Sequence, residues 1–252
     1  MLILITNDDG VHSPGLSALV DAFAELGRVV VVAPDRERSA AGHSLTLHSP
    51  LRADEIRTDV IAVDGTPTDC VNLGIHGLLA ERPSLVVSGI NKGGNMGDDI
   101  TYSGTVSAAM EATLMGVPAM AVSLSADSFR YEDFHFAGQA AYALAQKILE
   151  YGLPPDTFLN VNVPKGCPAG ARMTRQGKRR YGDVVVENLD PRGRKYYWIG
   201  GGELGFENVE GTDFHAVHEG YVSITPLHLD LTNYTSFTGL SRWDLDVFAK
   251  LA

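Results

Sequence analysis

The sequence predicts an α/β fold, built on a doubly wound and mostly parallel sheet. Strand and helix signals alternate over the first 125 residues, an order typical of βαβ units with right-handed crossovers. Residues 28–33 contain four consecutive valines, as in a parallel strand covered on both faces. With 252 residues, 44% of them hydrophobic, the chain can bury a sizeable core in one large domain.

The first two elements have clear boundaries. The apolar run at residues 2–5 has the length of a buried strand. Ser13 and Pro14 look like the N-cap and first position of a helix, which Gly27 ends. Residues 28–33 are then the second strand.

The alternation is less regular between residues 44 and 63. The segments 44–48 and 60–63 alternate polar and apolar side chains, a pattern typical of a hairpin. Thr66-Pro67 then opens a second helix. The remaining core elements are expected strands at 85–87, 119–124 and 158–163, and expected helices at 105–115 and 133–150.

The pattern changes near residue 165. Residues 166–211 are rich in Gly, Pro and charged side chains, which indicates an extension of hairpins rather than a second independent core. We therefore expect residues 1–165 to form a Rossmann-like core and residues 166–252 to be an extension of the same structural unit. Its expected elements are β-rich pieces at 183–187 and 195–199, a strand at 221–225 that could return to the main body, and a helical tail at 241–252.

Charge and cysteine content exclude several classes of protein. The net charge of −11 argues against binding of nucleic-acid polymers, which requires a basic surface. Cys70 and Cys167 lie far apart, so neither a disulfide framework nor a zinc ribbon is expected, and the cytoplasm is the simplest location. No apolar stretch approaches the length of about 18 residues that a membrane span needs.

Two adjacent acids, Asp8 and Asp9, follow the first strand. They therefore lie at the carboxyl edge of the sheet, where ligands bind in open α/β folds. Side-by-side carboxylates repel each other, and an oxygen-rich site of this kind suits Mg²⁺ or Mn²⁺. The alternative is an exposed acidic turn, since Asn-Asp-Asp-Gly is also good turn chemistry.

Two further loops begin at the same edge. The charged segment 34–43 follows the second strand, and its Ser39 could ligate a metal without adding charge, although the segment could also be only a solvated loop. In the Gly-rich loop 88–104, Asn91 could offer an amide oxygen to a metal and Asn95 could donate to a phosphate. Its length favours a function.

That loop ends where a helix begins, at Ser103-Gly104-Thr105. Free backbone N–H groups and the helix dipole favour an anion at such a position. Ser103 or Thr105 could also be merely an N-cap, and capping does not exclude anion binding. The loop matches neither a P-loop nor a dinucleotide-binding glycine pattern.

Together these loops predict a divalent ion bound to a phosphate. Such an ion polarises the phosphoryl group and lowers the pKa of a bound water, which then attacks phosphorus. Asp8 or Asp9 could also orient or deprotonate that water. One metal ion is expected, because only two acids are adjacent. The histidines are scattered, with His43 and His215 as the two that could assist.

Two rival hypotheses use the same acids. Asp8 could be the nucleophile of a phosphatase that forms an aspartyl-phosphate, although adjacent acids do not fit the usual Asp-x-Asp pattern. Alternatively, the chain could be a receiver-like signalling domain with Asp64 as the phospho-acceptor, although it is too long for that module.

Six blocks of the sequence together resemble the survival protein E (SurE) family of metal-dependent 5′/3′-nucleotidases. The resemblance covers almost the whole chain. The blocks lie, in order, at residues 5–10, 33–43, 65–71, 88–97, 103–105 and 220–227.

The resemblance implies a site, a reaction and an assembly. The family places one divalent ion per subunit on the positions that match Asp8, Asp9, Ser39 and Asn91. Its members dephosphorylate nucleoside monophosphates, and some also act on short polyphosphate. They form dimers or tetramers, often by exchanging a C-terminal segment, which fits the hairpin-rich extension as an oligomerisation element. The resemblance and the residues together suggest phosphate binding by Asn95, Ser103, Gly104 and Thr105.

Overall fold

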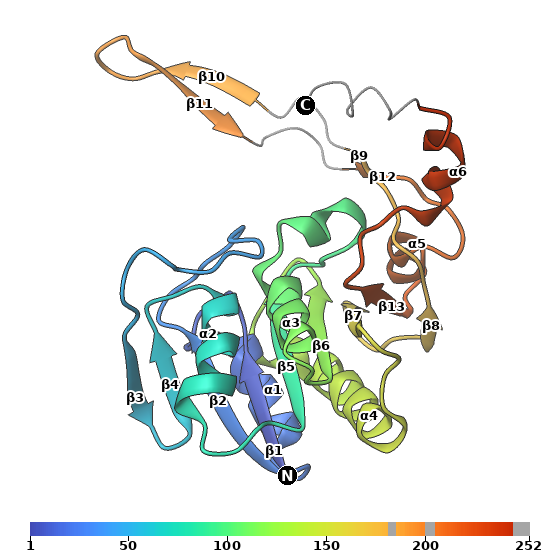
Figure 1. The fold of residues 1–252 in the computed structure, drawn as a ribbon. Helices are drawn as coiled ribbons and strands as arrows, with labels where there is room; N and C mark the ends of the chain where they lie inside the picture. The colour runs from blue at the N-terminus through green and yellow to red at the C-terminus, as the bar shows by residue number, and fades with distance from the viewer. Residues whose placement is uncertain (181–184, 200–204, 244–252) are drawn as a thin grey trace, which may run out of the picture.

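A nine-stranded sheet forms the centre of the protein (Figure 1), in a computed structural model that describes residues 1–180, 185–199 and 205–243. The strand order is β3-β4-β2-β1-β5-β6-β7-β13-β8. Strands β4 to β7 of this order are mutually parallel. Strand β3 is antiparallel to β4, β13 is antiparallel to β7, and β8 pairs parallel to β13. The strands are β1 (Leu2–Thr6), β2 (Arg28–Pro34), β3 (Ala53–Arg57), β4 (Val60–Val63), β5 (Leu85–Lys92), β6 (Ala119–Ser125), β7 (Thr157–Pro164), β8 (Ala171–Met173) and β13 (Val222–His228). The predicted fold class is confirmed.

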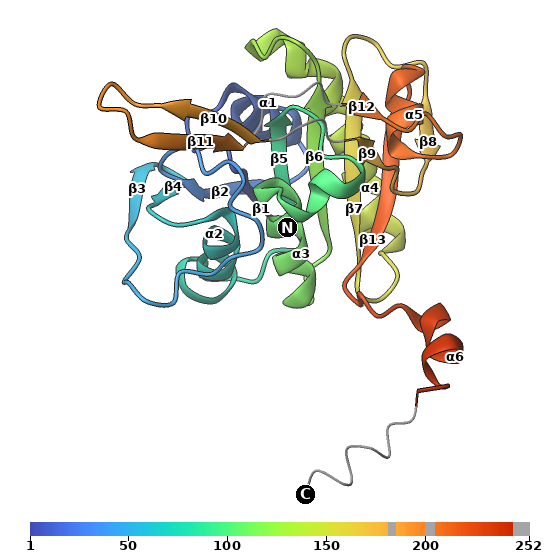
Figure 2. The same ribbon diagram turned by 90° about the horizontal axis from the view of Figure 1, so that it is seen from above.

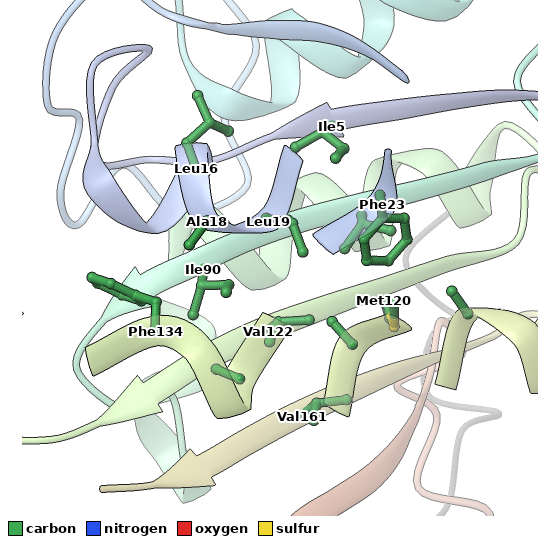
Figure 3. Packing of buried hydrophobic residues seen from close by; sticks show 14 of the residues in the cluster. Ile5, Leu16, Ala18, Leu19, Phe23, Ile90, Met120, Val122, Phe134 and Val161 are labelled. Atoms are coloured by element: carbon green, nitrogen blue, oxygen red, sulfur yellow. The ribbon is translucent and has the colours of Figure 1, made fainter. Parts of the chain in front are cut away.

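Helices cover both faces of this sheet (Figure 2). The helices α1 (Pro14–Phe23) and α4 (His135–Tyr151) pack on one face, and α2 (Pro67–Leu73) and α3 (Gly104–Leu114) on the other. Alternation along β1 divides its side chains between the two cores, with Ile3 and Ile5 facing α1 and α4, and Leu2 and Leu4 facing the opposite layer. Figure 3 shows Ile5 among the α1 side chains Leu16, Leu19 and Phe23.

The first half of the chain departs from the predicted boundaries in three places. Helix α1 ends at Phe23 rather than near Gly27, and the Ser13 side chain makes no capping hydrogen bond. The hairpin consists of β3 and β4, so the predicted strand at residues 44–48 is wrong. Strand β5 continues to Lys92, and the 3₁₀ helix η2 (Gly97–Thr101) lies within the predicted loop.

The buried side chain of Asp69 explains why residues 44–48 are not a strand. Its carboxylate accepts hydrogen bonds from the backbone N–H of Thr46 (2.8 Å) and from the Thr46 hydroxyl (2.7 Å). The same carboxylate completes a capping box with Thr66 at the start of α2, whose predicted opening is confirmed. Because these bonds satisfy Thr46, the segment lies against the start of α2 instead of pairing with a strand.

The second half returns to the sheet as expected. Strand β13 pairs with β7, and helix α5 (Asp213–His218) precedes it. An antiparallel hairpin of β10 (Val185–Leu189) and β11 (Lys195–Ile199) projects from the body in Figure 1. A short pair, β9 (Arg179–Arg180) and β12 (Gly205–Phe206), lies at its base.

Two predicted elements lie partly outside the described residues. The β-rich piece is predicted at residues 183–187, and the described strand β10 begins at Val185. The helical tail is predicted at residues 241–252, of which only 241–243 are described. They form a turn after the short helices η4 (Tyr234–Ser236) and α6 (Phe237–Leu240). None of the helices in the described part is long and apolar enough to cross a membrane.

Candidate active site

The three predicted loops meet at the carboxyl ends of β1, β2 and β5. There they enclose a cavity of about 430 Å³, a size typical of small-molecule sites. All four predicted metal ligands line it, as do Asn95 and Ser103 among the predicted phosphate-binding residues. The full lining is Asp8, Asp9, Glu37, Ser39, Ala40, Asn91, Lys92, Asn95, Asp99, Tyr102, Ser103 and Phe129.

The carboxylate of Asp8 is the most buried charged group of the cavity. The residue is only 6% exposed, and its two oxygens accept hydrogen bonds from the Thr105 hydroxyl (2.5 Å) and the Thr105 backbone N–H (3.1 Å). Burial raises the pKa of Asp8 to about 6, despite these bonds, and the neighbouring charge of Asp9 adds to the rise. Asp8 is therefore a site where a cation would relieve an unfavourable charge.

Gly104 allows α3 to approach this carboxylate. A Cβ atom at Gly104 would lie 2.9 Å from the Asp8 Cβ and 3.0 Å from its Oδ2. Any larger residue would push the start of α3 away from β1. Gly104 thus contributes through its missing side chain, which brings the Thr105 N–H within reach of Asp8.

Asp9 is held by the end of β5. The Lys92 backbone N–H donates to its Oδ2 at 3.1 Å, and the Lys92 ammonium lies 3.8 Å from its Oδ1. Burial raises the pKa of Asp9, and the charge of Lys92 partly offsets that effect. The two acids therefore differ, since Asp8 has only neutral donors whereas Asp9 has a cation nearby.

The two neutral metal-ligand candidates present oxygen atoms to the cavity. Asn91 uses its Nδ2 to donate to the Gly93 carbonyl at 2.8 Å, which leaves its Oδ1 as the atom for a cation. The Ser39 hydroxyl donates to Glu37 Oε1 at 2.6 Å and keeps its lone pairs. Among the described residues no group of three or more His, Cys, Asp or Glu could hold a metal ion. The set of two carboxylates, one hydroxyl and one amide oxygen fits a hard divalent ion such as Mg²⁺ or Mn²⁺.

Asn95 is fixed by polar side chains from β6 and β7. Its backbone N–H donates to Asn162 Oδ1 (2.8 Å), and its carbonyl accepts from the amides of Asn160 (2.8 Å) and Asn162 (2.9 Å). Its own amide donates to the Ser123 hydroxyl at 2.8 Å and has a second N–H for a ligand. Sequence reasoning missed this support, although two asparagines in an otherwise apolar strand were a usable signal.

Ser103 and Thr105, both predicted to bind phosphate, have different surroundings at the start of α3, since Ser103 lines the cavity and Thr105 does not. Ser103 is the N-cap, accepting from the Val106 N–H at 3.1 Å, and its hydroxyl proton can still be donated. Thr105 is fully buried and is not part of the cavity lining. Its hydroxyl and N–H both donate to Asp8, whereas the sequence hypothesis assigned it to phosphate.

Two further acids, Asp213 and Glu111, hold the loops around the cavity. Asp213, which sequence reasoning did not identify, accepts hydrogen bonds from the backbone N–H groups of Gly97 (2.7 Å) and Gly177 (2.8 Å) and thereby holds the loop after β5. Glu111 of α3 accepts from His43 Nε2 (2.7 Å) and from the Asn72 amide (3.1 Å). His43 thus anchors the loop that carries Ser39.

The remaining candidates lie elsewhere. His215 bonds to the Asn208 side chain at 2.8 Å and does not line the cavity. Asp64, the phospho-acceptor of the receiver-like hypothesis, accepts from the Arg52 N–H at 2.8 Å and is also absent from the lining.

Comparisons with known proteins agree on one family. The model of the family described as "Survival protein SurE" matches residues 3–183. The chain is 70% identical to "5′-nucleotidase SurE" of Syntrophotalea carbinolica, over 97% of this chain and 98% of the relative. It is 63% identical to the protein of the same name from Geobacter sulfurreducens, over 97% and 94% of the two chains. The crystal structure of the SurE protein from Aquifex aeolicus superposes with a TM-score of 0.85 at 47% identity, covering 99% and 100% of the two chains.

The raised pKa of Asp8 predicts a pH-dependent cost in stability. The folded state holds the Asp8 proton more tightly than the unfolded state does. Protonated Asp8 therefore stabilises the folded state fully below about pH 4, and this stabilisation is lost as the pH rises through about 6. In EDTA, Asp8→Asn should therefore increase the free energy of unfolding at pH 8 by about 1–3 kcal/mol. Urea unfolding at pH 4 and pH 8 checks this. The gain should shrink toward pH 4, and the exposed-site variant Asp54→Asn should show none; a pH-independent gain would contradict the assignment.

The Glu111 anchor predicts a loss of stability when it is removed. Glu111→Ala leaves His43 and Asn72 without their acceptor and should cost about 1–3 kcal/mol at pH 7. The His43 and Asn72 hydrogen bonds lower the pKa of Glu111, so its contribution is present above the unfolded pKa and is lost on acidification. Urea unfolding at pH 7 and pH 3.5 measures both effects. An equal loss at the two pH values would mean that the ionised carboxylate is not the stabilising form.

Proposed function

The chain belongs to the SurE family, and on this premise we propose that it hydrolyses nucleoside monophosphates to nucleoside and phosphate. Relatives up to 70% identical bear the name 5′-nucleotidase. The observation that carries the proposal is the pairing of the Asp8 and Asp9 carboxylates with the start of α3 in one cavity. That pairing provides a cation site beside an anion site, as hydrolysis of a phosphate monoester requires.

We propose that Asp8, Asp9, the Ser39 hydroxyl and Asn91 Oδ1 hold one Mg²⁺ or Mn²⁺ ion. The burial of Asp8 and the raised pKa values of both acids support this assignment. When bound, the ion would neutralise phosphate charge and acidify a water molecule. Asp9 would orient that water through its Oδ1, which lies 3.8 Å from the Lys92 ammonium and is not the oxygen that accepts the Lys92 N–H, whereas both Asp8 oxygens accept hydrogen bonds from Thr105.

The phosphate would bind at the start of α3. Ser103 can donate its hydroxyl proton, because its lone pair already accepts the capping N–H of Val106. The free N–H group of Gly104 and the second amide proton of Asn95 add two neutral donors. In this proposal Thr105 acts through Asp8, whose carboxylate it orients, instead of contacting phosphate directly.

We also propose that the protein hydrolyses nucleoside 3′-monophosphates and short polyphosphate and that it is cytoplasmic. Hydrolysis of 3′-monophosphates and of short polyphosphate would use the same phosphate site, because the cavity is open to solvent around it. A cytoplasmic location is supported by two unpaired cysteines, one buried and one exposed.

An assay of phosphate release tests the reaction and the site together. Wild type should release phosphate from nucleoside 5′- and 3′-monophosphates with Mg²⁺ or Mn²⁺ and not with EDTA. Asp8→Asn should lower turnover about a hundredfold or more, because it weakens the cation site, while Asp54→Asn should retain wild-type turnover. Metal-independent release, or a fully active Asp8→Asn variant, would reject the proposed site.

We further propose that the β10–β11 hairpin joins copies of this chain into a homodimer or homotetramer. Its large apolar side chains are exposed, with Trp198 at 65% and Ile199 at 88%, and an isolated two-stranded hairpin is marginally stable in water. A second chain would cover these side chains.

Sedimentation velocity tests this assembly. The double variant Trp198→Glu, Ile199→Glu should shift the protein toward monomer, because it places charges in the proposed contact. A matched variant at another exposed apolar site, Tyr151→Glu, should sediment as wild type does. A wild-type protein that is monomeric at micromolar concentration would contradict the proposal.

A further inference from the structure

We propose that Tyr102 is the surface on which the nucleobase of the substrate stacks, with Phe129 as a second aromatic wall. The inference rests on the proposed nucleotidase function. It concerns how the site would distinguish a nucleotide from other phosphate monoesters.

Tyr102 lies directly beside the proposed phosphate site. It precedes Ser103 in the chain, lines the same cavity, and is 64% exposed. Its backbone is fixed, since its N–H donates to the Asp99 carbonyl at 3.0 Å and its carbonyl accepts from the Gly42 N–H at 3.2 Å. A large exposed ring on a fixed backbone loses little entropy on contact with a ligand, which favours a binding role.

Phe129 brings a second ring to the cavity from a different loop. It follows β6, lines the cavity and is half-buried. Its ring packs against the fully buried Phe134, with 6.3 Å between centroids, and so is anchored in the core under α1 and α4. The cavity therefore has aromatic rings from two loops in addition to its polar floor.

The charges of the cavity show why such contacts would be needed. In the part of the chain that the structure describes, the lining contains the carboxylates of Asp8, Asp9 and Glu37 and one cationic side chain, that of Lys92. Asp99 forms an ion pair with Arg179. Among the described residues, no arginine lines the cavity to bind phosphate with two parallel hydrogen bonds. Contacts to the uncharged part of a nucleotide would therefore add affinity that this acidic lining does not supply to the phosphate.

Stacking on an aromatic ring meets this requirement. A base presents a neutral flat face, and its stacking on Tyr or Phe is strong and tolerant of base identity. A cavity of about 430 Å³ has room for a nucleoside next to the phosphate. The expected consequence is a preference for nucleotides over sugar phosphates with little choice among bases.

A pair of substrates that differ only in the base tests the inference. Adenosine 5′-monophosphate and ribose 5-phosphate would be compared on wild type, Tyr102→Ala, Tyr102→Phe and the control Tyr151→Ala, whose tyrosine is 73% exposed at the end of α4. Tyr102→Ala should raise KM for the nucleotide about tenfold, with KM for ribose 5-phosphate unchanged within about twofold. Tyr102→Phe should retain wild-type values, as should Tyr151→Ala. The inhibition constant of adenosine, measured against ribose 5-phosphate, should rise in parallel in Tyr102→Ala.

The outcomes separate this inference from the function on which it rests. If Tyr102→Ala changes KM equally for both substrates, or for neither, the stacking role is overturned while the nucleotidase proposal stands. If wild type hydrolyses neither substrate with Mg²⁺ or Mn²⁺, the nucleotidase proposal itself fails, and the stacking role with it. Far-UV circular dichroism and thermal unfolding of each variant ensure that a loss reflects the ring and not the fold.

Discussion

The contact between Asp8 and Thr105 determines how the rest of the site is arranged. A carboxylate just after β1 accepts hydrogen bonds from the backbone N–H and the hydroxyl of Thr105, the second residue of α3, across 97 residues of sequence. Burying that charge is unfavourable, and two neutral donors only partly compensate for it. Asp8 stays buried because hydrophobic packing on the two faces of the sheet holds β1 and α3 in place. Gly104 then lets them approach closely enough for a cation and an anion to share one cavity.

Around this contact the protein builds a polar support from elements that are otherwise apolar. Ser123 of β6 and Asn160 and Asn162 of β7 are all buried, and all three bond to Asn95. A buried polar group that loses its hydrogen bond is costly, so these bonds to Asn95 favour one position of the loop over others. These bonds hold Asn95, which precedes the short helix η2, in a fixed position within the connection from β5 to α3.

The sequence allowed accurate prediction where one physical rule applied locally. Apolar runs located the parallel strands, and the carboxyl-edge rule brought Asp8, Asp9, Ser39 and Asn91 to one cavity. Prediction was less successful where the deciding partner was remote. Residues 44–48 alternate as well as a strand does, and only the distant Asp69 determines that they form none. Likewise, the N-cap pattern at Ser103 could not reveal that Thr105 donates its hydrogen bonds to Asp8. Tyr102 and Phe129 lie outside helices and strands, so no periodicity in the sequence indicates them.

The bonds of Asp213 also bear on when the site can form during synthesis. Gly97 lies in the first half of the chain, but the carboxylate that holds its N–H is 116 residues further on. A nascent polypeptide leaves the ribosome from its N-terminus, so the parallel strands can assemble well before Asp213 emerges. Until then the loop that follows β5 and carries Asn95 lacks one of its anchors. The cavity therefore reaches its final geometry only after Asp213 has been synthesised, and shorter nascent chains would contain the acids without the complete site.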